Sequence, residues 1–223
     1  MWKKYFGKKA KIIGIDFNPE CKKFETKDCK IFIGDQADKN FWKFFFSKVG
    51  KVDIVLDDGG HTNHQQIIST LSCIPNIKNG GKMVVEDTHT SYQFRFGNPS
   101  KYSFINYSKK IIDDINSTTH PEYTNFKYSL RKFIYSVIFY ESFCIFCIDR
   151  TKTYKNLMID NKKKRFNYKD YRFHDSKTLN KLKLNFSFLL KYSFSKFIIK
   201  NLLLVYKYLL NKNKIRKYAK HFK

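Results

Sequence analysis

Acidic residues are scarce in this 223-residue sequence, in which 19 aspartates and glutamates stand against 44 lysines and arginines, for a formal net charge of +25. The shortage is greatest beyond residue 150, where 21 basic residues accompany three acids, Asp160, Asp170 and Asp175. A segment this basic attracts phosphate-rich partners, either nucleic acid or an anionic membrane surface. The abundant Lys, Asn, Phe, Tyr and Ile also have A/T-rich codons, so genome composition is an equal explanation for part of the charge.

Cysteines are few, and their pattern is irregular. The five are odd in number and scattered, so they imply no disulfide framework. Cys144 and Cys147 have the spacing of half a zinc or redox site, but they lie in the apolar run SFCIFCIDR without a second Cys or His pair at metal spacing. We therefore expect buried structural thiols.

Two kinds of long apolar run are missing. The N-terminal stretch MWKKYFGKKAK carries charge without the apolar core of a secretory signal, so a reducing cytoplasmic location is expected. Near the C-terminus, lysines recur too often for a membrane span, which needs about 20 apolar residues. Residues 186–223 instead predict a basic amphipathic helix, suited to peripheral contact with an anionic membrane. Packing of this helix on the protein core, with its lysines in water, is the alternative.

Short apolar runs rich in β-branched residues alternate with helix-compatible stretches in the first half of the chain. Asn18 has the character of an N-cap and Pro19 that of a first helical residue, while Asn79–Gly81 indicates a turn before the fourth run. The alternation predicts a parallel, doubly wound α/β sheet. The runs are residues 12–17, 30–34, 52–58 and 82–88, and the stretches between them are 18–25, 40–49 and 62–77.

A different pattern follows. Residues 100–118 predict a helix, and residues 133–150 predict two strands joined by a tight turn at residues 140–142. The sequence therefore predicts a parallel sheet finished by an antiparallel hairpin. We expect an α/β domain over residues 1–150 and a basic, helical extension over residues 151–223.

Acidic residues follow every one of the four predicted parallel strands. Ligands of such sheets bind at the carboxyl ends of the strands, so these acids are expected to line one edge. An acid that closes an early strand of a nucleotide-binding unit typically bonds ribose hydroxyls, which suits Asp16, and Asp35 and Gln36 would then face the base. The acids are Asp16, Asp35, Asp57, Asp58, Glu86 and Asp87.

Three of these carboxylates predict a metal site. Asp58, Glu86 and Asp87 follow two strands that should be neighbours, and carboxylate oxygens are the ligands that Mg²⁺ prefers. His61 lies on the turn after Asp58 and suits a general base, since an imidazole can take a proton from an alcohol acidified by a metal. N-capping of the following helices, the first of them near Thr62, would explain the acids individually.

Several motifs in residues 1–150 resemble those of the class I S-adenosylmethionine-dependent methyltransferases. More narrowly, they resemble the metal-dependent sugar O-methyltransferases of the macrocin and mycinamicin type, a group that shares motifs with rhamnosyl O-methyltransferases and cephalosporin hydroxylases. The pair formed by D-D-G-G-H and E-D-T-H-T-S-Y is specific, whereas the other motifs are general for the fold. The motifs are GIDFNPECKKF, IGDQADKNFW, VDIVLDDGGHTNHQQ and NGGKMVVEDTHTSY.

The resemblance implies a role for each candidate residue. Asp58, Glu86 and Asp87 match Mg²⁺ ligands, and His61 matches the general base. The implied reaction transfers a methyl group from S-adenosylmethionine to a sugar hydroxyl of a glycan or glycoside precursor. The residues matched to binding of the S-adenosylmethionine cofactor are Asp16, Asp35, Gln36 and Asp57.

One family feature has no counterpart here. The family begins with a strand and a glycine-rich turn, E-x-G-x-x-x-G-S, whereas this sequence opens with a stretch that matches the end of the helix after that turn. The expected fold is thus a Rossmann-like sheet without its first strand, which should leave a gap with unpaired backbone. A cephalosporin-hydroxylase-like enzyme, and an inactive fragment whose basic tail binds an anionic membrane, are the alternatives. Nucleic acid is not an expected partner, because no nucleic-acid motif of known spacing is present.

Overall fold

The computed structural model divides the chain into two compact units, Met1–Leu157 and Met158–Lys223. Most of the amphipathic helix predicted for residues 186–223 lies outside the described residues. Among those described, no helix has the length and apolar character that crossing a membrane requires. The structure describes residues 2–96, 101–117, 126–152, 161–162, 197–198, 201–202, 205–206, 208–209, 219 and 221.

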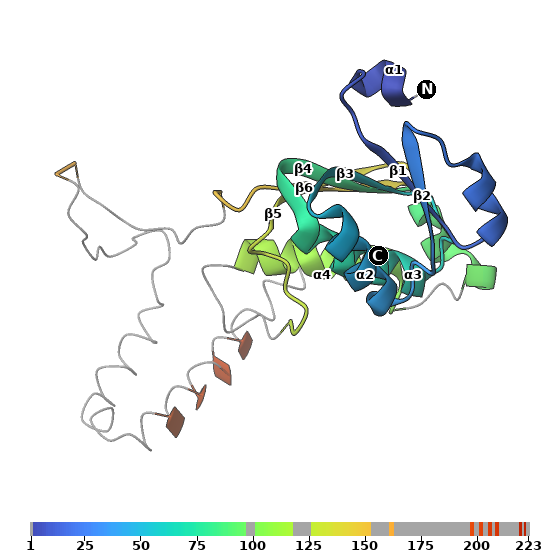
Figure 1. The fold of residues 1–223 in the computed structure, drawn as a ribbon. Helices are drawn as coiled ribbons and strands as arrows, with labels where there is room; N and C mark the ends of the chain where they lie inside the picture. The colour runs from blue at the N-terminus through green and yellow to red at the C-terminus, as the bar shows by residue number, and fades with distance from the viewer. Residues whose placement is uncertain are drawn as a thin grey trace. The chain divides into compact units, whose positions relative to one another are not determined.

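The strands of the first unit occur in the predicted order, and α-helices lie within the stretches 40–49, 62–77 and 100–118, or within one residue of them, as predicted (Figure 1). The strands are β1 (Ile12–Asp16), β2 (Cys29–Ile33), β3 (Val52–Asp57), β4 (Ile77–Val85), β5 (Ile134–Tyr140) and β6 (Phe143–Ile148). The α-helices are α1 (Trp2–Phe6), α2 (Lys39–Val49), α3 (Asn63–Cys73) and α4 (Phe104–Asn116). Short 3₁₀ helices are η1 (Pro19–Phe24), η2 (Ile74–Asn76), η3 (Thr88–Tyr92) and η4 (Phe94–Phe96).

The strands form two hydrogen-bonded sheets. One contains β1 and β2 in parallel, and the other has the order β3-β4-β6-β5. In the larger sheet β3 and β4 are parallel, while β6 pairs antiparallel with both β4 and β5. The prediction of parallel strands finished by an antiparallel hairpin is therefore confirmed. Within the described ranges, β1 and β3 each keep one edge without a strand partner.

Local sequence signals explain where the helices begin. Asp38, Thr62 and Ser103 are the N-caps of α2, α3 and α4, and each side chain accepts a hydrogen bond from a backbone N–H of the first turn. Asn18 caps the segment that starts at Pro19, as predicted, although that segment is a 3₁₀ helix rather than an α-helix.

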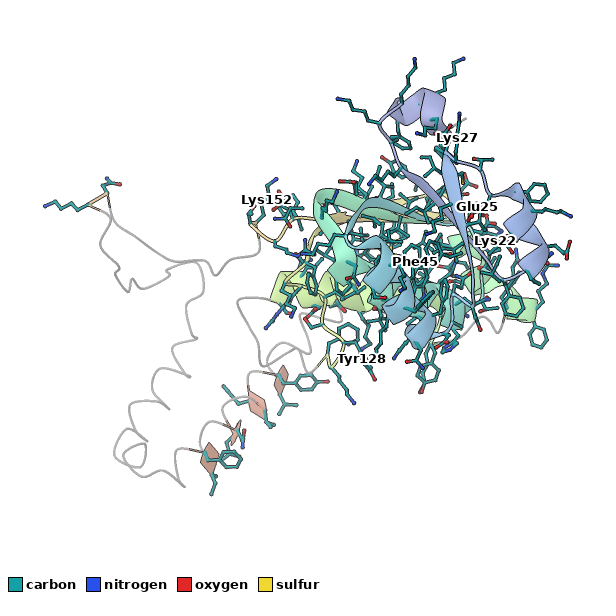
Figure 2. The ribbon with its side chains drawn as sticks, viewed as in Figure 1. Lys22, Glu25, Lys27, Phe45, Tyr128 and Lys152 are labelled. Carbon is teal, nitrogen blue, oxygen red and sulfur yellow. The ribbon has the colours of Figure 1, made fainter. Side chains whose placement is uncertain are left out.

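The core lies between the larger sheet and helices α2, α3 and α4, which share one side of it (Figure 1). Phe146 of β6 and Phe104 of α4 are fully buried and meet edge to face. Phe45 of α2 (Figure 2) contacts Phe32 of β2 edge-on, with 5.1 Å between ring centroids. The small sheet therefore packs on the same core although no backbone hydrogen bonds join it to the larger sheet.

No helix among the described residues packs on the other face of the larger sheet, so the predicted doubly wound arrangement, with helices on both faces, is not found there (Figure 1). Side chains alternate along a strand, so Val55 and Asp57 face the helices while Ile54 and Leu56 point the opposite way. Ile54 is 48% exposed and Leu56 is 41% exposed. Two apolar side chains of β3, an edge strand of this sheet, are thus substantially exposed.

Two details differ from the sequence prediction. Asn79–Gly81 is not a turn before the fourth strand, because β4 begins at Ile77 and contains these residues. Gly80 has a φ of 82°, and the pairing jumps from Val52–Ile77 to Ile54–Lys82. The glycines therefore form an irregular bulge inside the strand, which glycine accommodates because it tolerates positive φ.

The cysteines are all free thiols. Burial raises the pKa of Cys144 to about 12, so this thiol stays protonated and behaves as a small apolar side chain. Cys147 is only partly buried. The prediction of buried structural thiols is thus confirmed for Cys144 and only partly for Cys147.

Candidate metal and cofactor site

Asp57 ends β3 with its side chain directed to the helix-covered face. It is 8% exposed, and its carboxylate accepts hydrogen bonds from the Ser69 hydroxyl of α3 and from Gln36 Nε2 at 3.0 Å. Burial raises the pKa of Asp57, and these two hydrogen bonds oppose the rise. The carboxylate therefore joins the end of β3 to α3 and to the loop after β2.

The loop after β3 is held by the side chain of Gln36. Gln36 Oε1 accepts from the Gly60 N–H at 2.8 Å, while its Nε2 group binds Asp57. A Cβ atom at Gly59 would collide with the Gln36 amide, and one at Gly60 would collide with Gln65. The two glycines allow this close approach, and the loops after β2 and β3 lie side by side as a result.

Helix capping does not account for the acids. The N-cap of α3 is Thr62, which forms a reciprocal capping box with Gln65, so the capping explanation is wrong for Asp58. Asp87 occupies the N-cap position of η3, yet its side chain makes no capping hydrogen bond. Both carboxylates remain available for another role.

Asp58, His61 and Asp87 converge at the carboxyl ends of the adjacent strands β3 and β4. Each offers one ligand atom, and these atoms lie within 4.8 Å of one another. His61 Nε2 is 3.5 Å from Asp87 Oδ2 and 3.9 Å from Asp58 Oδ1. His61 Nδ1 is buried, with no hydrogen-bond partner among the described residues. Two carboxylates and an imidazole so placed suit a divalent cation.

Glu86 lies beside this group but is not one of the three converging residues. Its backbone N–H donates to the Asp57 carbonyl at 3.0 Å, and its carbonyl accepts from Gln66 Nε2 at 3.0 Å. Partial burial, followed by the charges of Asp58 and Asp87, raises the pKa of Glu86. Its carboxylate thus shares the electrostatic field of the other two acids, in which a cation would be favoured.

The predicted nucleotide acids lie at the ends of the small sheet. Asp16 ends β1 and is exposed, and hydrogen bonds from the Asn18 N–H and the Cys21 thiol lower its pKa. Asp35 follows β2 and accepts from the Ala37 N–H at 2.7 Å. Asp16 is therefore ionised at neutral pH and can accept further hydrogen bonds.

The structure adds residues to which sequence reasoning gave no role. His89 Nδ1 contacts the Ser142 hydroxyl in the β5–β6 turn and is 3.7 Å from Asp87 Oδ1. Thr90 is buried, and its hydroxyl lies 2.9 Å from the His61 carbonyl. The motif E-D-T-H-T-S-Y contains His89 and Thr90, whereas Ser142 reaches the site only through strand pairing. His64, the other histidine of the β3–α3 region, is exposed on α3.

The fold and this site together define a Rossmann-like α/β domain with a candidate metal centre where its parallel strands end. No protein-family model matches the chain. Comparison with known proteins narrows the class and confirms the predicted resemblance to sugar O-methyltransferases. The chain is 32% identical over 130 residues to mycinamicin VI 2''-O-methyltransferase of Micromonospora griseorubida. It is 30% identical over 127 residues to demethylmacrocin O-methyltransferase of Streptomyces fradiae.

A solved structure supports the same likeness. This structure is the MycE methyltransferase of the mycinamycin biosynthetic pathway, in complex with Mg and SAH. It superimposes on this chain with a TM-score of 0.61 and 26% sequence identity, and the match covers 67% of this chain and 39% of MycE. The sequence matches cover 56% and 55% of this chain and 32% of each relative. The chain therefore corresponds to about a third of the length of these relatives.

Proposed function

We propose that this chain carries the site of an S-adenosylmethionine- and Mg²⁺-dependent O-methyltransferase that acts on a sugar hydroxyl of a glycoside. The convergence of Asp58, His61 and Asp87 at one sheet edge carries the proposal. Similar proteins support it, because one is named as a 2'-O-methyltransferase of a rhamnosyl tetracenomycin-C and the MycE structure contains Mg and SAH.

Asp58, Glu86 and Asp87 would hold the cation. Bound there, a divalent cation would supply the charge that lowers the pKa of a sugar hydroxyl. His61 Nε2 would accept the proton from that hydroxyl, and the carboxylates at 3.5 and 3.9 Å would stabilise the resulting imidazolium. The methyl group would pass from the sulfonium of S-adenosylmethionine to the acceptor oxygen.

The cofactor would lie along the ends of β1, β2 and β3. Asp16 would accept hydrogen bonds from the ribose hydroxyls, a role that its lowered pKa favours. Asp35 and Gln36 would face the adenine side. The Gln36 amide forms hydrogen bonds with Asp57 and Gly60. Gln36 and Asp57 would therefore act mainly by fixing the backbone of the loops that line the proposed cofactor site.

We further propose that the sheet lacks one parallel strand between β1 and β3. Within the part of the chain that the structure describes, each of these strands keeps one edge without a strand partner, and Gln36 links the loop after β2 to the loop after β3. The outer edge of β2 is covered instead, because the Ile31 N–H donates to Glu25 and its carbonyl accepts from Lys22 (Figure 2). Unpaired strand edges are normally protected in this way or filled. A strand ending in a glycine-rich turn would fill the gap and cradle the cofactor.

Calorimetric titration with S-adenosylmethionine, with and without Mg²⁺, tests both proposals. The 223-residue chain would be compared with a version extended by a strand and a glycine-rich turn. We expect the extended chain to bind in the micromolar range usual for enzyme ligands, and the shorter chain to bind much more weakly. Micromolar binding by the shorter chain would refute the proposal of a missing strand but not the methyltransferase proposal. Binding by neither chain would refute the methyltransferase proposal.

We propose that residues 151–223 form a separate basic extension, which contacts anionic lipid through residues 186–223. Its 21 basic residues against three acids support this proposal, since each lysine or arginine near an anionic surface adds about 1 kcal/mol of attraction. Residues 1–150 would be the catalytic domain of a cytoplasmic protein, a location that the free thiols support. The full chain should sediment with phosphatidylserine vesicles and not with phosphatidylcholine vesicles. Equal sedimentation with both would contradict the proposal.

A further inference from the structure

Three non-glycine residues around the candidate metal centre have left-handed backbone conformations. Their φ angles are 58° for His61, 53° for Asp87 and 66° for Ser142. Such conformations are disfavoured for residues with a side chain, and they persist where the surrounding structure imposes them. Specific contacts must therefore hold these backbone segments in place.

Thr90 makes contacts of this kind with two of the three residues. Its hydroxyl oxygen lies 2.9 Å from the His61 carbonyl and 2.8 Å from the Asp87 carbonyl, and its N–H donates to the Asp87 carbonyl at 3.0 Å. The hydroxyl has one proton, which the two carbonyl oxygens share. Thr90 is 4% exposed, so water competes little for these hydrogen bonds.

The two carbonyls belong to segments that the chain brings together only in the folded state. His61 follows β3 and Asp87 follows β4, and their side chains face each other at 3.5 Å. A hydroxyl that binds both carbonyls sets the distance between the two backbone segments. It thereby sets the distance between the His61 ring and the Asp87 carboxylate.

We propose that Thr90 is a positioning residue of the metal centre, acting through the carbonyls of His61 and Asp87. The proposal rests on the metal-binding part of the proposed function. Thr90 itself is buried and its hydroxyl contacts the two carbonyls, so it would not touch the cation or the acceptor. Loss of its hydroxyl would let the two segments separate and loosen the ligand geometry, because metal affinity depends on residues that orient the ligands.

The test compares Mn²⁺ binding, by calorimetry and by electron paramagnetic resonance, in the 223-residue chain and in three variants. Thr90→Val removes the hydroxyl and keeps the shape, whereas Thr90→Ser keeps the hydroxyl. Thr70→Val is the matched control, since Thr70 is also buried and its hydroxyl also donates to a backbone carbonyl, that of Gln66 within α3. Thermal unfolding of each variant shows whether it remains folded.

We expect Thr90→Val to weaken Mn²⁺ binding by about 10-fold or more and to alter the resonance spectrum, while its unfolding temperature changes no more than that of Thr70→Val. Thr90→Ser should bind nearly as tightly as the parent chain. If Thr90→Val does not fold, the smaller Thr90→Ala serves the same comparison. If Thr90→Val binds Mn²⁺ as tightly as the parent chain, the positioning role of Thr90 is overturned, while the metal centre itself is not. Failure of the parent chain to bind Mn²⁺ overturns the metal centre and the inference together.

Discussion

Replacement of Asp87 by asparagine is expected to weaken Mg²⁺ or Mn²⁺ binding by about 100-fold or more, beyond the effect of residues that only orient ligands. The substitution removes a negative oxygen from a site that has few other ligands, and hard cations prefer charged oxygen. Asparagine has nearly the shape of aspartate and also tolerates the positive φ found at this position. The loss should therefore appear in metal titrations without loss of folding.

Asp53→Asn is the matched control for this variant. Asp53 lies on β3, the strand that pairs with β4, and its carboxylate is 76% exposed and pairs with Lys78 at 3.1 Å. Exposed ion pairs contribute about 1 kcal/mol or less, so this variant should bind metal as the parent chain does. Equal affinity of the Asp87→Asn variant and the parent chain would exclude Asp87 as a ligand.

His61→Asn separates the two roles that the geometry permits for the imidazole. As a general base, His61 would be needed for proton removal, so this variant should bind metal almost normally and lose about 10²- to 10⁴-fold in methyl transfer. A loss of metal affinity as large as that of Asp87→Asn would instead make His61 a ligand.

Replacement of Phe146 by alanine is expected to lower the free energy of unfolding by about 3–5 kcal/mol. Phe146 is fully buried on β6, between β4 and β5, and its ring meets Phe104 of α4 with 6.4 Å between centroids. This loss is a large part of the total free energy of unfolding, which is about 5–15 kcal/mol for a typical domain. Urea unfolding followed by circular dichroism measures it.

Phe94→Ala is the control, because Phe94 is the same residue type but 92% exposed. Its replacement should change the unfolding free energy by no more than about 0.5 kcal/mol. If the two variants had similar effects, Phe146 would not be part of the packed core.

Most of the secondary structure was predictable, because it depends on local patterns. The end of each parallel strand lies within two residues of an acid that the sequence singled out, such as Asp16 for β1 and Asp57 for β3. The start of β4 was misplaced by five residues, since the glycines before Lys82 have the composition of a turn. Only pairing with β3 keeps these glycines inside the strand.

The location of the candidate site could be predicted from the sequence, but the contacts of its side chains could be predicted only in part. Asp58 and Asp87 were expected to meet because neighbouring parallel strands end at the same edge, and their carboxylates do converge on His61. The direction of each side chain depends on backbone angles and burial that the sequence does not reveal. Asp57, next to Asp58, faces α3 instead, and Glu86 lies beside the converging group rather than within it.

The sequence by itself determined the alternation of strands and helices, the edge where the acids gather and the likeness to sugar O-methyltransferases, because these depend on residue order and spacing. Only the tertiary structure decided that His61 and Asp87 adopt left-handed backbone conformations and that their carbonyls contact the Thr90 hydroxyl. It also decided that Ser142, in the β5–β6 turn, contacts His89. These features arise from contacts between segments far apart in the chain, which form only when the strands pair and the helices pack.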